Sequence, residues 1–101
     1  MVTEVLRVNK DSYEILNKAS LLLNKGELVA IPTETVYGLG ANAYDKNACL
    51  NIFKAKGRPS DNPLIIHIAE PADAEKYAYT NSLYYKLASA FMPGPLTVIL
   101  K

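Results

Sequence analysis

Apolar residues recur along the chain in two patterns, and each pattern predicts one kind of element. Short apolar runs, which are typical of β-strands, occupy residues 4–8, 28–31, 64–69 and 96–100. The runs at 28–31 and 64–69 are almost continuously apolar, as expected of strands that are covered on both faces. Between the runs, apolar residues recur every three or four positions, which favours helices with one buried face. The sequence therefore predicts strands that alternate with helices.

The residues that would begin and end the first two helices are common helix caps. Asp11 or Ser12 can cap the first helix, and Gly26 can end it. Asp45 can cap the second helix, which Gly57 can end. The predicted buried faces are Ile15, Leu16, Ala19, Leu22 and Leu23 in the first helix and Ala48, Cys49, Ile52 and Phe53 in the second.

Two shorter helices are predicted in the last third of the chain. Pro71 fits the first turn of a helix that ends near Ala78. Asn81 or Ser82 can cap a further helix, which the segment Pro93-Gly94-Pro95 breaks. The residues expected to face inward from this last helix are Leu83, Leu87, Ala88 and Phe91.

This order of elements predicts an α/β fold with a twisted, partly parallel sheet and flanking helices. The 101 residues suffice for one domain. The chain stops one residue after the apolar run at 96–100, and such an end would leave a strand edge bare. We therefore expect residues 1–101 to be a truncated domain.

The composition narrows the class of protein. A net charge of +1 gives little support to a broad RNA-binding face, because such faces carry a larger basic excess. Cys49 is the single cysteine, so no internal disulfide can form. The N-terminal residues are too polar for a signal peptide, and no apolar stretch approaches the roughly 20 residues of a membrane span. These features predict a soluble, cytoplasmic protein.

Residues 32–40 follow the predicted strand at 28–31 and are candidates for a ligand-binding loop. In open α/β sheets, ligands bind beyond the carboxyl ends of the strands. The segment carries two threonine hydroxyls, one carboxylate and two glycines, and the glycines let backbone N–H groups approach an anion. The same residue types are common in ordinary turns, so both interpretations stay open.

Three cations, Lys54, Lys56 and Arg58, lie within five residues at the predicted end of the second helix. Cations in this position complement the helix dipole, which would account for Lys54. The cations continue, however, into a loop that glycine and proline fix. A guanidinium held in such a loop can bind phosphate oxygens through two parallel hydrogen bonds. We therefore favour phosphate binding by Arg58.

His67 is the single histidine and lies within the predicted strand at 64–69. A period of two places it on one face with Ile65 and Ala69. A histidine in such a strand is more often a hydrogen-bonded core residue than a ligand-binding one, and the strand pattern alone leaves both interpretations of His67 open. One histidine and one cysteine far apart in the sequence disfavour a structural metal site, so no metal ligands are predicted.

Four motifs resemble, in order and spacing, those of the threonylcarbamoyl-AMP synthase family, whose fold is the YrdC-like domain. They are PTETVYGLGANA at residues 32–43, the KxR motif of Lys56 and Arg58, DNPLIIHI at 61–68 and PGPLT at 93–97. The resemblance runs from Gly26 to Lys101 and implies that residues 1–101 are the N-terminal half of a single YrdC-like domain. The second half of the family's domain, with a Ser-x-Asn motif and further arginines, has no counterpart in these residues.

The resemblance also implies an activity. Members of the family convert L-threonine, bicarbonate and ATP into threonylcarbamoyl-adenylate and pyrophosphate, and the product serves threonylcarbamoyladenosine formation in tRNA. Lys56 and Arg58 would act as catalytic residues by stabilising charge on the phosphates, together with the Mg²⁺ that accompanies ATP. By resemblance the binding residues are Thr35 and His67 for L-threonine and Lys56, Arg58 and Asn62 for ATP, with Pro32 and Thr33 shaping the pocket.

The resemblance leaves alternatives open. The chain could be a non-catalytic fragment of the family that binds a nucleotide or RNA. It could also be a related carbamoyl-adenylate-forming domain of the hydrogenase-maturation carbamoyltransferases, but the short N-terminal extension contains no acylphosphatase or zinc-finger sequence, which weighs against this alternative. The partners to consider are tRNA, tRNA-modifying transferase proteins and a second copy of this chain, which could form a homodimer through exposed strand edges.

Overall fold

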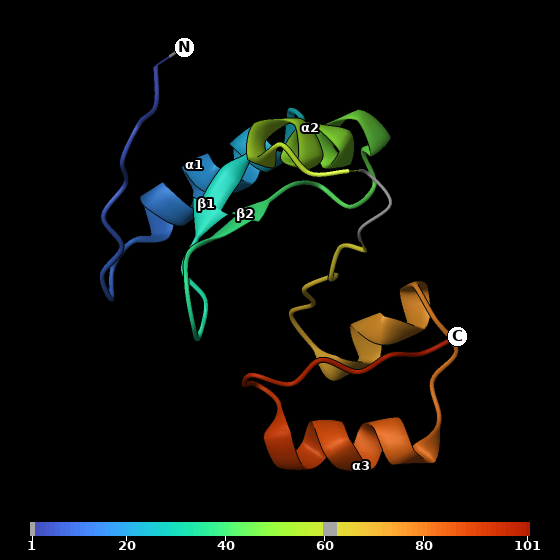
Figure 1. Ribbon diagram of the computed structural model, residues 1–101. Helices are drawn as coiled ribbons and strands as arrows, with labels where there is room; N and C mark the ends of the chain where they lie inside the picture. The colour runs from blue at the N-terminus through green and yellow to red at the C-terminus, as the bar shows by residue number, and fades with distance from the viewer. Residues whose placement is uncertain (1, 60–62) are drawn as a thin grey trace. The chain divides into compact units, whose positions relative to one another are not determined.

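The computed structural model describes residues 2–59 and 63–101 as a mixed α/β structure, which divides into two compact units, Met1–Asn62 and Pro63–Lys101 (Figure 1). Within the described residues no helix is long and apolar enough to cross a membrane. The first unit contains α1 (Tyr13–Asn24), β1 (Val29–Ile31), β2 (Gly38–Gly40) and α2 (Lys46–Lys56), and the second contains the 3-10 helix η1 (Pro71–Lys76) and α3 (Ser82–Phe91).

The sheet of the first unit is a hairpin. Strands β1 and β2 pair antiparallel, with Val29 opposite Gly40 and Ile31 opposite Gly38, and residues 32–37 connect them. The prediction of a partly parallel sheet is therefore wrong for the described residues, whose one sheet has these two strands. The physical reason is the connection, because six residues can join antiparallel neighbours but are too few for the crossover that parallel strands need.

The predictions of the other three strands are also wrong for the described residues. Residues 4–8, 64–69 and 96–100 have no strand assignment in the part of the chain that the structure describes. A strand requires a neighbouring backbone at about 4.8 Å, and an apolar run alone cannot supply one. Residues 96–100 still alternate as a strand would, because Val98 and Leu100 pack on the core of the second unit whereas Ile99 is 94% exposed.

Helix α1 begins where the sequence predicts but is not capped as expected. Ser12 is the N-cap residue and is buried, yet its side chain makes no capping hydrogen bond. Its hydroxyl instead accepts a hydrogen bond from the Asn9 N–H and donates one to Asn9 Oδ1 at 3.0 Å. None of the residues of α1 is fully buried, so its predicted apolar face is only partly covered. An ion pair of 2.5 Å between Lys18 and Glu4 links α1 to the N-terminal segment.

Helix α2 agrees with the sequence prediction at both ends. Asp45 Oδ1 accepts a hydrogen bond of 3.0 Å from the Ala48 N–H, and Gly57 ends the helix in the left-handed region with φ of +67°. Such a conformation costs glycine little, because glycine has no Cβ. The side chains of Ala48, Ile52 and Phe53 are buried as predicted, whereas Cys49, the fourth residue of the predicted face, is half-buried. Helix α2 therefore supplies the buried apolar residues described in the first unit.

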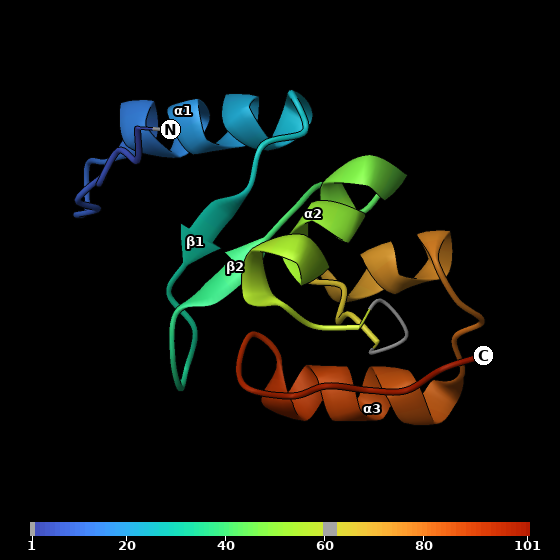
Figure 2. The ribbon, with the colours of Figure 1, turned by 45° about the horizontal axis from the view of Figure 1, so that its top comes forward.

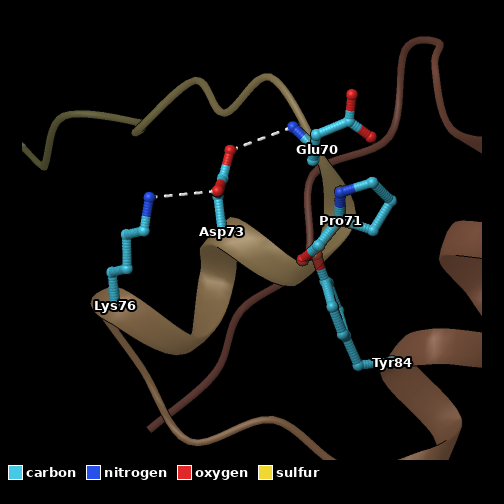
Figure 3. Close-up of polar contacts among 5 residues, drawn as sticks. All are labelled: Glu70, Pro71, Asp73, Lys76 and Tyr84. Carbon is cyan, nitrogen blue, oxygen red and sulfur yellow. Dashed lines mark hydrogen bonds and ion pairs between the residues drawn. The ribbon is translucent and has the colours of Figure 1, made fainter.

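Tyr84 is the centre of the second unit. Its side chain is only 2% exposed, and its hydroxyl donates a hydrogen bond of 2.7 Å to the Pro71 carbonyl oxygen of η1 (Figure 3). Ala74 and Ala88 are buried with it. The C-terminal segment lies beside η1 and α3 in both ribbon views, and the Tyr79 N–H donates to the Lys101 carbonyl oxygen at 2.7 Å (Figures 1 and 2).

The position of Tyr84 corrects the predicted face of α3. Leu83 and Phe91, which were expected to face inward, are 62% and 59% exposed. The helix begins where predicted, because Asn81 Oδ1 accepts a hydrogen bond of 2.8 Å from the Tyr84 N–H. Ala88 is buried as predicted and Leu87 is half-buried, but the other buried residue of the helix is Tyr84, which was not expected to face inward. Burial of the Tyr84 ring and its hydrogen bond to η1 decide which side of the helix is covered.

Asp73 fixes the start of η1. One carboxylate oxygen accepts a hydrogen bond of 3.1 Å from the Glu70 N–H, and the other lies 3.2 Å from Lys76 Nζ (Figure 3). The backbone hydrogen bond and then the lysine hold the pKa of the Asp73 carboxyl below its usual value of 3.8. Pro71 occupies the first turn, as the sequence predicts.

We expect Tyr84→Phe to destabilise the second unit by about 1 kcal/mol, because the Pro71 carbonyl would lose its partner in a partly buried position. Amide hydrogen exchange within α3 measures this unit separately from the first. Tyr85→Phe is the matched control, since the Tyr85 hydroxyl bonds Glu75 at the exposed surface. Equal exchange rates in the two variants would contradict the role assigned to Tyr84.

Candidate functional site

The loop at residues 32–37 carries Thr35, the predicted threonine-binding residue of the first unit. Both ribbon views show this loop projecting from the β1–β2 hairpin (Figures 1 and 2). Thr35 is exposed, as are its neighbours Val36 and Tyr37. Thr33 is half-buried at the base of the loop, and its hydroxyl forms hydrogen bonds with the backbone of the loop. The side chain of Thr35 is therefore accessible to a ligand, while the hydroxyl of Thr33 is engaged within the protein.

The hydroxyl of Thr33 makes three hydrogen bonds within the loop. It accepts from the Val36 N–H at 3.2 Å and from the Thr35 N–H at 3.4 Å, and it donates to the Val36 carbonyl oxygen. By resemblance, Thr33 was expected only to shape the pocket. The available signal was a threonine at the start of a loop, where its hydroxyl commonly bonds the backbone two or three residues on.

The C-terminal end of α2 presents the two predicted phosphate-binding cations. The Gly57 N–H donates to the Lys54 carbonyl oxygen at 3.3 Å, and the Arg58 N–H donates to that of Phe53 at 3.0 Å. The backbone of Arg58 is thus tied to the last turn of α2. The side chains of Lys56 and Arg58 are exposed, and no ion pair holds either of them within residues 2–59 and 63–101.

This arrangement favours an anion outside the helix end. The carbonyl groups at a helix C-terminus already attract cations, which explains Lys54 and Lys56 without any ligand. Arg58 lies beyond the helix, and its N–H satisfies a helix carbonyl while its guanidinium stays exposed. The fixed backbone removes the backbone part of the entropic cost of binding, and the planar guanidinium loses less freedom per hydrogen bond to a phosphate than a lysine ammonium does. Arg58 is accordingly the stronger of the two candidates for phosphate binding.

His67 lies in the second unit and corrects a prediction. The strand pattern favoured a hydrogen-bonded core histidine, whereas His67 is exposed. The neighbouring Ile68 packs on the core of the unit, so an alternating backbone turns His67 away from it. Ile65 and Ala69, which were expected to share the face of His67, are likewise exposed.

The predicted site residues are divided between the two units. Thr35, Lys56 and Arg58 belong to the first unit and His67 to the second, while Asn62 lies outside the described residues. In the described part of the chain, no hydrogen bond or ion pair connects Thr35 with the cations of α2. A hydroxyl-bearing loop and a cationic helix end can separately bind a polar small molecule and a phosphate.

Two surface hollows lie elsewhere. One of about 400 Å³ is formed by Asn9 and the first residues of α1, and one of about 360 Å³ lies beside Tyr79 and Lys101. Neither is lined by a predicted site residue. Among the residues that the structure describes, no group of three or more histidine, cysteine or acidic side chains could hold a metal ion.

Residues 21–101 match the family model Sua5_yciO_yrdC, which is described as "Telomere recombination". The chain is 57% identical over 83 residues to threonylcarbamoyl-AMP synthase of Pyrococcus abyssi, and this match covers 81% of this chain and 24% of the relative. It is 48% identical over 100 residues to threonylcarbamoyl-AMP synthase of Bacillus subtilis, and this match covers 98% of this chain and 28% of the relative. The chain thus spans about a quarter of the length of these relatives.

Solved structures agree with the sequence comparison. The fold is similar to the structure of H234A/Y235A P. abyssi Sua5, with a TM-score of 0.84 and 48% identity over 92% of this chain and 28% of that one. It is also similar to the crystal structure of P. abyssi Sua5 complexed with L-threonine, with a TM-score of 0.75 and 49% identity over 88% of this chain and 26% of that one. The structural similarity therefore includes a protein that binds L-threonine.

We expect Gly57→Ala to destabilise the end of α2 by about 1–2 kcal/mol, because an L-residue strains the left-handed conformation. Among the described residues, no heavy atom outside Gly57 and its two chain neighbours lies within 4 Å of the position that a Cβ would occupy, so within this part of the chain the loss would arise from the backbone and not from a clash. Urea unfolding measures the loss, and hydrogen exchange of the Arg58 amide reports the helix end itself.

Gly57→Asn is the matched control, because asparagine tolerates the left-handed region better than alanine. It should lose less stability than Gly57→Ala. If the two variants are equally stable, the left-handed cap does not determine where Arg58 lies.

Proposed function

This chain belongs to the threonylcarbamoyl-AMP synthase family, which the Sua5_yciO_yrdC model describes, and we therefore propose that it takes part in the synthesis of L-threonylcarbamoyladenylate. The substrates would be L-threonine, bicarbonate and ATP, and the product would serve threonylcarbamoyladenosine formation in tRNA in the cytoplasm. Residues 1–101 would provide one part of the catalytic domain. The proposed partners are tRNA-modifying transferases, which would receive the adenylate.

The observation that carries this proposal is the cationic end of α2. Lys56 and Arg58 are exposed there, and the Arg58 backbone is held by the Phe53 carbonyl at 3.0 Å. The proposed reaction requires cations that stabilise charge on the triphosphate, and it requires no nucleophile from the protein. Together with Asn62, which the KxR-to-DNP spacing places four residues after Arg58, these side chains would bind ATP.

The chemistry requires charge stabilisation and positioning. Bicarbonate and the amino group of L-threonine give a carbamate, with loss of water. A carbamate oxygen then attacks the α-phosphorus of ATP, a P–O bond forms, and the bond to the pyrophosphate leaving group breaks. Lys56 and Arg58 would stabilise the charge that develops on the phosphate oxygens, and Mg²⁺ carried by the triphosphate would add to this effect. Holding both reactants close together supplies the remainder of the rate enhancement.

Thr35 and His67 are the proposed contacts for L-threonine. Both side chains are exposed in their own units, so neither has to leave a buried position before it can bind. The Thr35 hydroxyl and the His67 imidazole can each donate or accept a hydrogen bond. This matches the polar groups that the amino acid presents, namely an ammonium, a carboxylate and a hydroxyl.

A second candidate function is binding without chemistry. The chain spans about a quarter of the length of its relatives, and the relatives' remaining residues could hold groups that the reaction needs. In that case residues 1–101 would bind a nucleotide or RNA but would release no pyrophosphate. The net charge of +1 favours a nucleotide over RNA.

We expect the polypeptide that carries these residues to release pyrophosphate from ATP only when L-threonine and bicarbonate are both present. Labelled L-threonine and a coupled pyrophosphate assay measure the reaction, and L-serine in place of L-threonine controls for amino-acid selectivity. ATP binding without threonine-dependent release of pyrophosphate would establish the second candidate instead.

We expect Arg58→Ala to weaken ATP binding and to lower the rate by about a hundredfold, since loss of one transition-state contact costs roughly 3 kcal/mol. The side chain is exposed, so the unfolding midpoint should not change. Titration calorimetry with ATP measures the affinity.

Two variants control for charge and geometry. Lys46→Ala removes an exposed cation from the opposite end of α2 and should leave ATP affinity unchanged. Arg58→Lys keeps the charge but loses the paired N–H groups, so only part of the affinity should return. If Arg58→Ala and Lys46→Ala weaken ATP binding equally, the effect is one of overall charge and Arg58 does not bind the phosphates.

A further inference from the structure

The loop that carries Thr35 has one internal support. Between β1 and β2, residues 32–37 make no backbone–backbone hydrogen bond with one another in the described part of the chain. Their N–H groups at Thr35 and Val36 both donate to Thr33 Oγ1, at 3.4 and 3.2 Å, and the same hydroxyl donates to the Val36 carbonyl oxygen. The conformation of the loop around Thr35 therefore depends on a single side-chain oxygen.

Such a support matters because an exposed loop is otherwise free to adopt many conformations. Each residue whose backbone is fixed loses conformational entropy, and a ligand that has to order the loop binds more weakly by that amount. Val36 and Tyr37 are 70% and 78% exposed, so packing does not restrain the loop at these positions. The Thr33 hydroxyl orders the loop before any ligand arrives.

The two arms of the Thr33 side chain have separate tasks. Its methyl carbon Cγ2 lies 3.3 Å from the position that a Cβ on Gly38 would occupy, so the methyl group packs against the start of β2. Its hydroxyl faces the loop. Thr33→Val keeps the methyl contact and removes the hydrogen bonds, whereas Thr33→Ser keeps the hydroxyl and removes the methyl contact. The two substitutions therefore separate loop support from packing.

We propose that Thr33 is a positioning residue that holds Thr35 in the place from which it binds L-threonine. This inference rests on the proposed function, because it takes Thr35 as a threonine contact. Thr33 needs no contact with the substrate. Its hydroxyl is engaged by the backbone of Thr35 and Val36, and it acts on the ligand through Thr35.

Titration of L-threonine into the polypeptide that carries these residues tests the inference. Thr33→Val should weaken threonine binding by about three- to tenfold, the range expected for one net hydrogen bond, and Thr33→Ser should restore most of the affinity. ATP affinity should be unchanged in both variants, because the cations of α2 lie on another element. Hydrogen exchange at the Thr35 and Val36 amides should be faster in Thr33→Val and close to the unaltered rate in Thr33→Ser.

A double-mutant cycle separates positioning from a general effect on the fold. If Thr33 acts through Thr35, the Thr33→Val effect on threonine affinity should disappear in a Thr35→Ala background. An equal effect in both backgrounds, or unchanged threonine affinity in Thr33→Val, would overturn the inference. Lack of threonine binding by the unaltered chain would instead overturn the proposed function, and unchanged amide exchange in Thr33→Val would then overturn the loop support as well.

Discussion

The buried face of α2 is the constraint on which the rest of the first unit depends. Ala48, Ile52 and Phe53 are the buried apolar residues described in that unit, and they lie on one face of one helix. Burial of such a face supplies most of the stability of a short helix, because isolated helices of this length are marginal in water. The caps at Asp45 and Gly57 fix where the helix begins and ends. The buried face and the caps of α2 therefore determine where the cations at the end of this helix lie.

This dependence connects stability with the proposed chemistry. An arginine binds phosphate at a lower entropic cost when its backbone is already fixed, and the Arg58 N–H donates a hydrogen bond to the carbonyl of Phe53, which is itself part of the buried face. The loop at residues 32–37, which carries Thr35, is ordered differently, because hydrogen bonds of the Thr33 hydroxyl and not packing hold it. A polar support suits a loop that has to stay exposed, since an apolar support would have to be covered. The two halves of the candidate site thus rest on different interactions.

The second unit depends on Tyr84 in the way that the first depends on α2. Its ring fills the space between η1 and α3, and its hydroxyl satisfies the Pro71 carbonyl (Figure 3). Ile68, Val98 and Leu100 pack on this core from the extended segments on either side of the helices. His67 follows from that packing, since its neighbour Ile68 takes the inward position. The exposure of the imidazole is a consequence of the core.

The sequence alone determined the helices and the family. Helix caps depend on local hydrogen bonds and on the left-handed freedom of glycine, so Asp45, Asn81 and Gly57 were readable without a fold. The motifs around Thr35 and Arg58 likewise identified the family that the comparisons confirm. Strand pairing and burial were decided by the tertiary structure. The run at 64–69 looks like a buried strand, and the buried face of α3 looks as if it includes Leu83 and Phe91, until the positions of neighbouring backbones and of the Tyr84 ring are known. Both properties depend on residues distant in sequence, which no local pattern records.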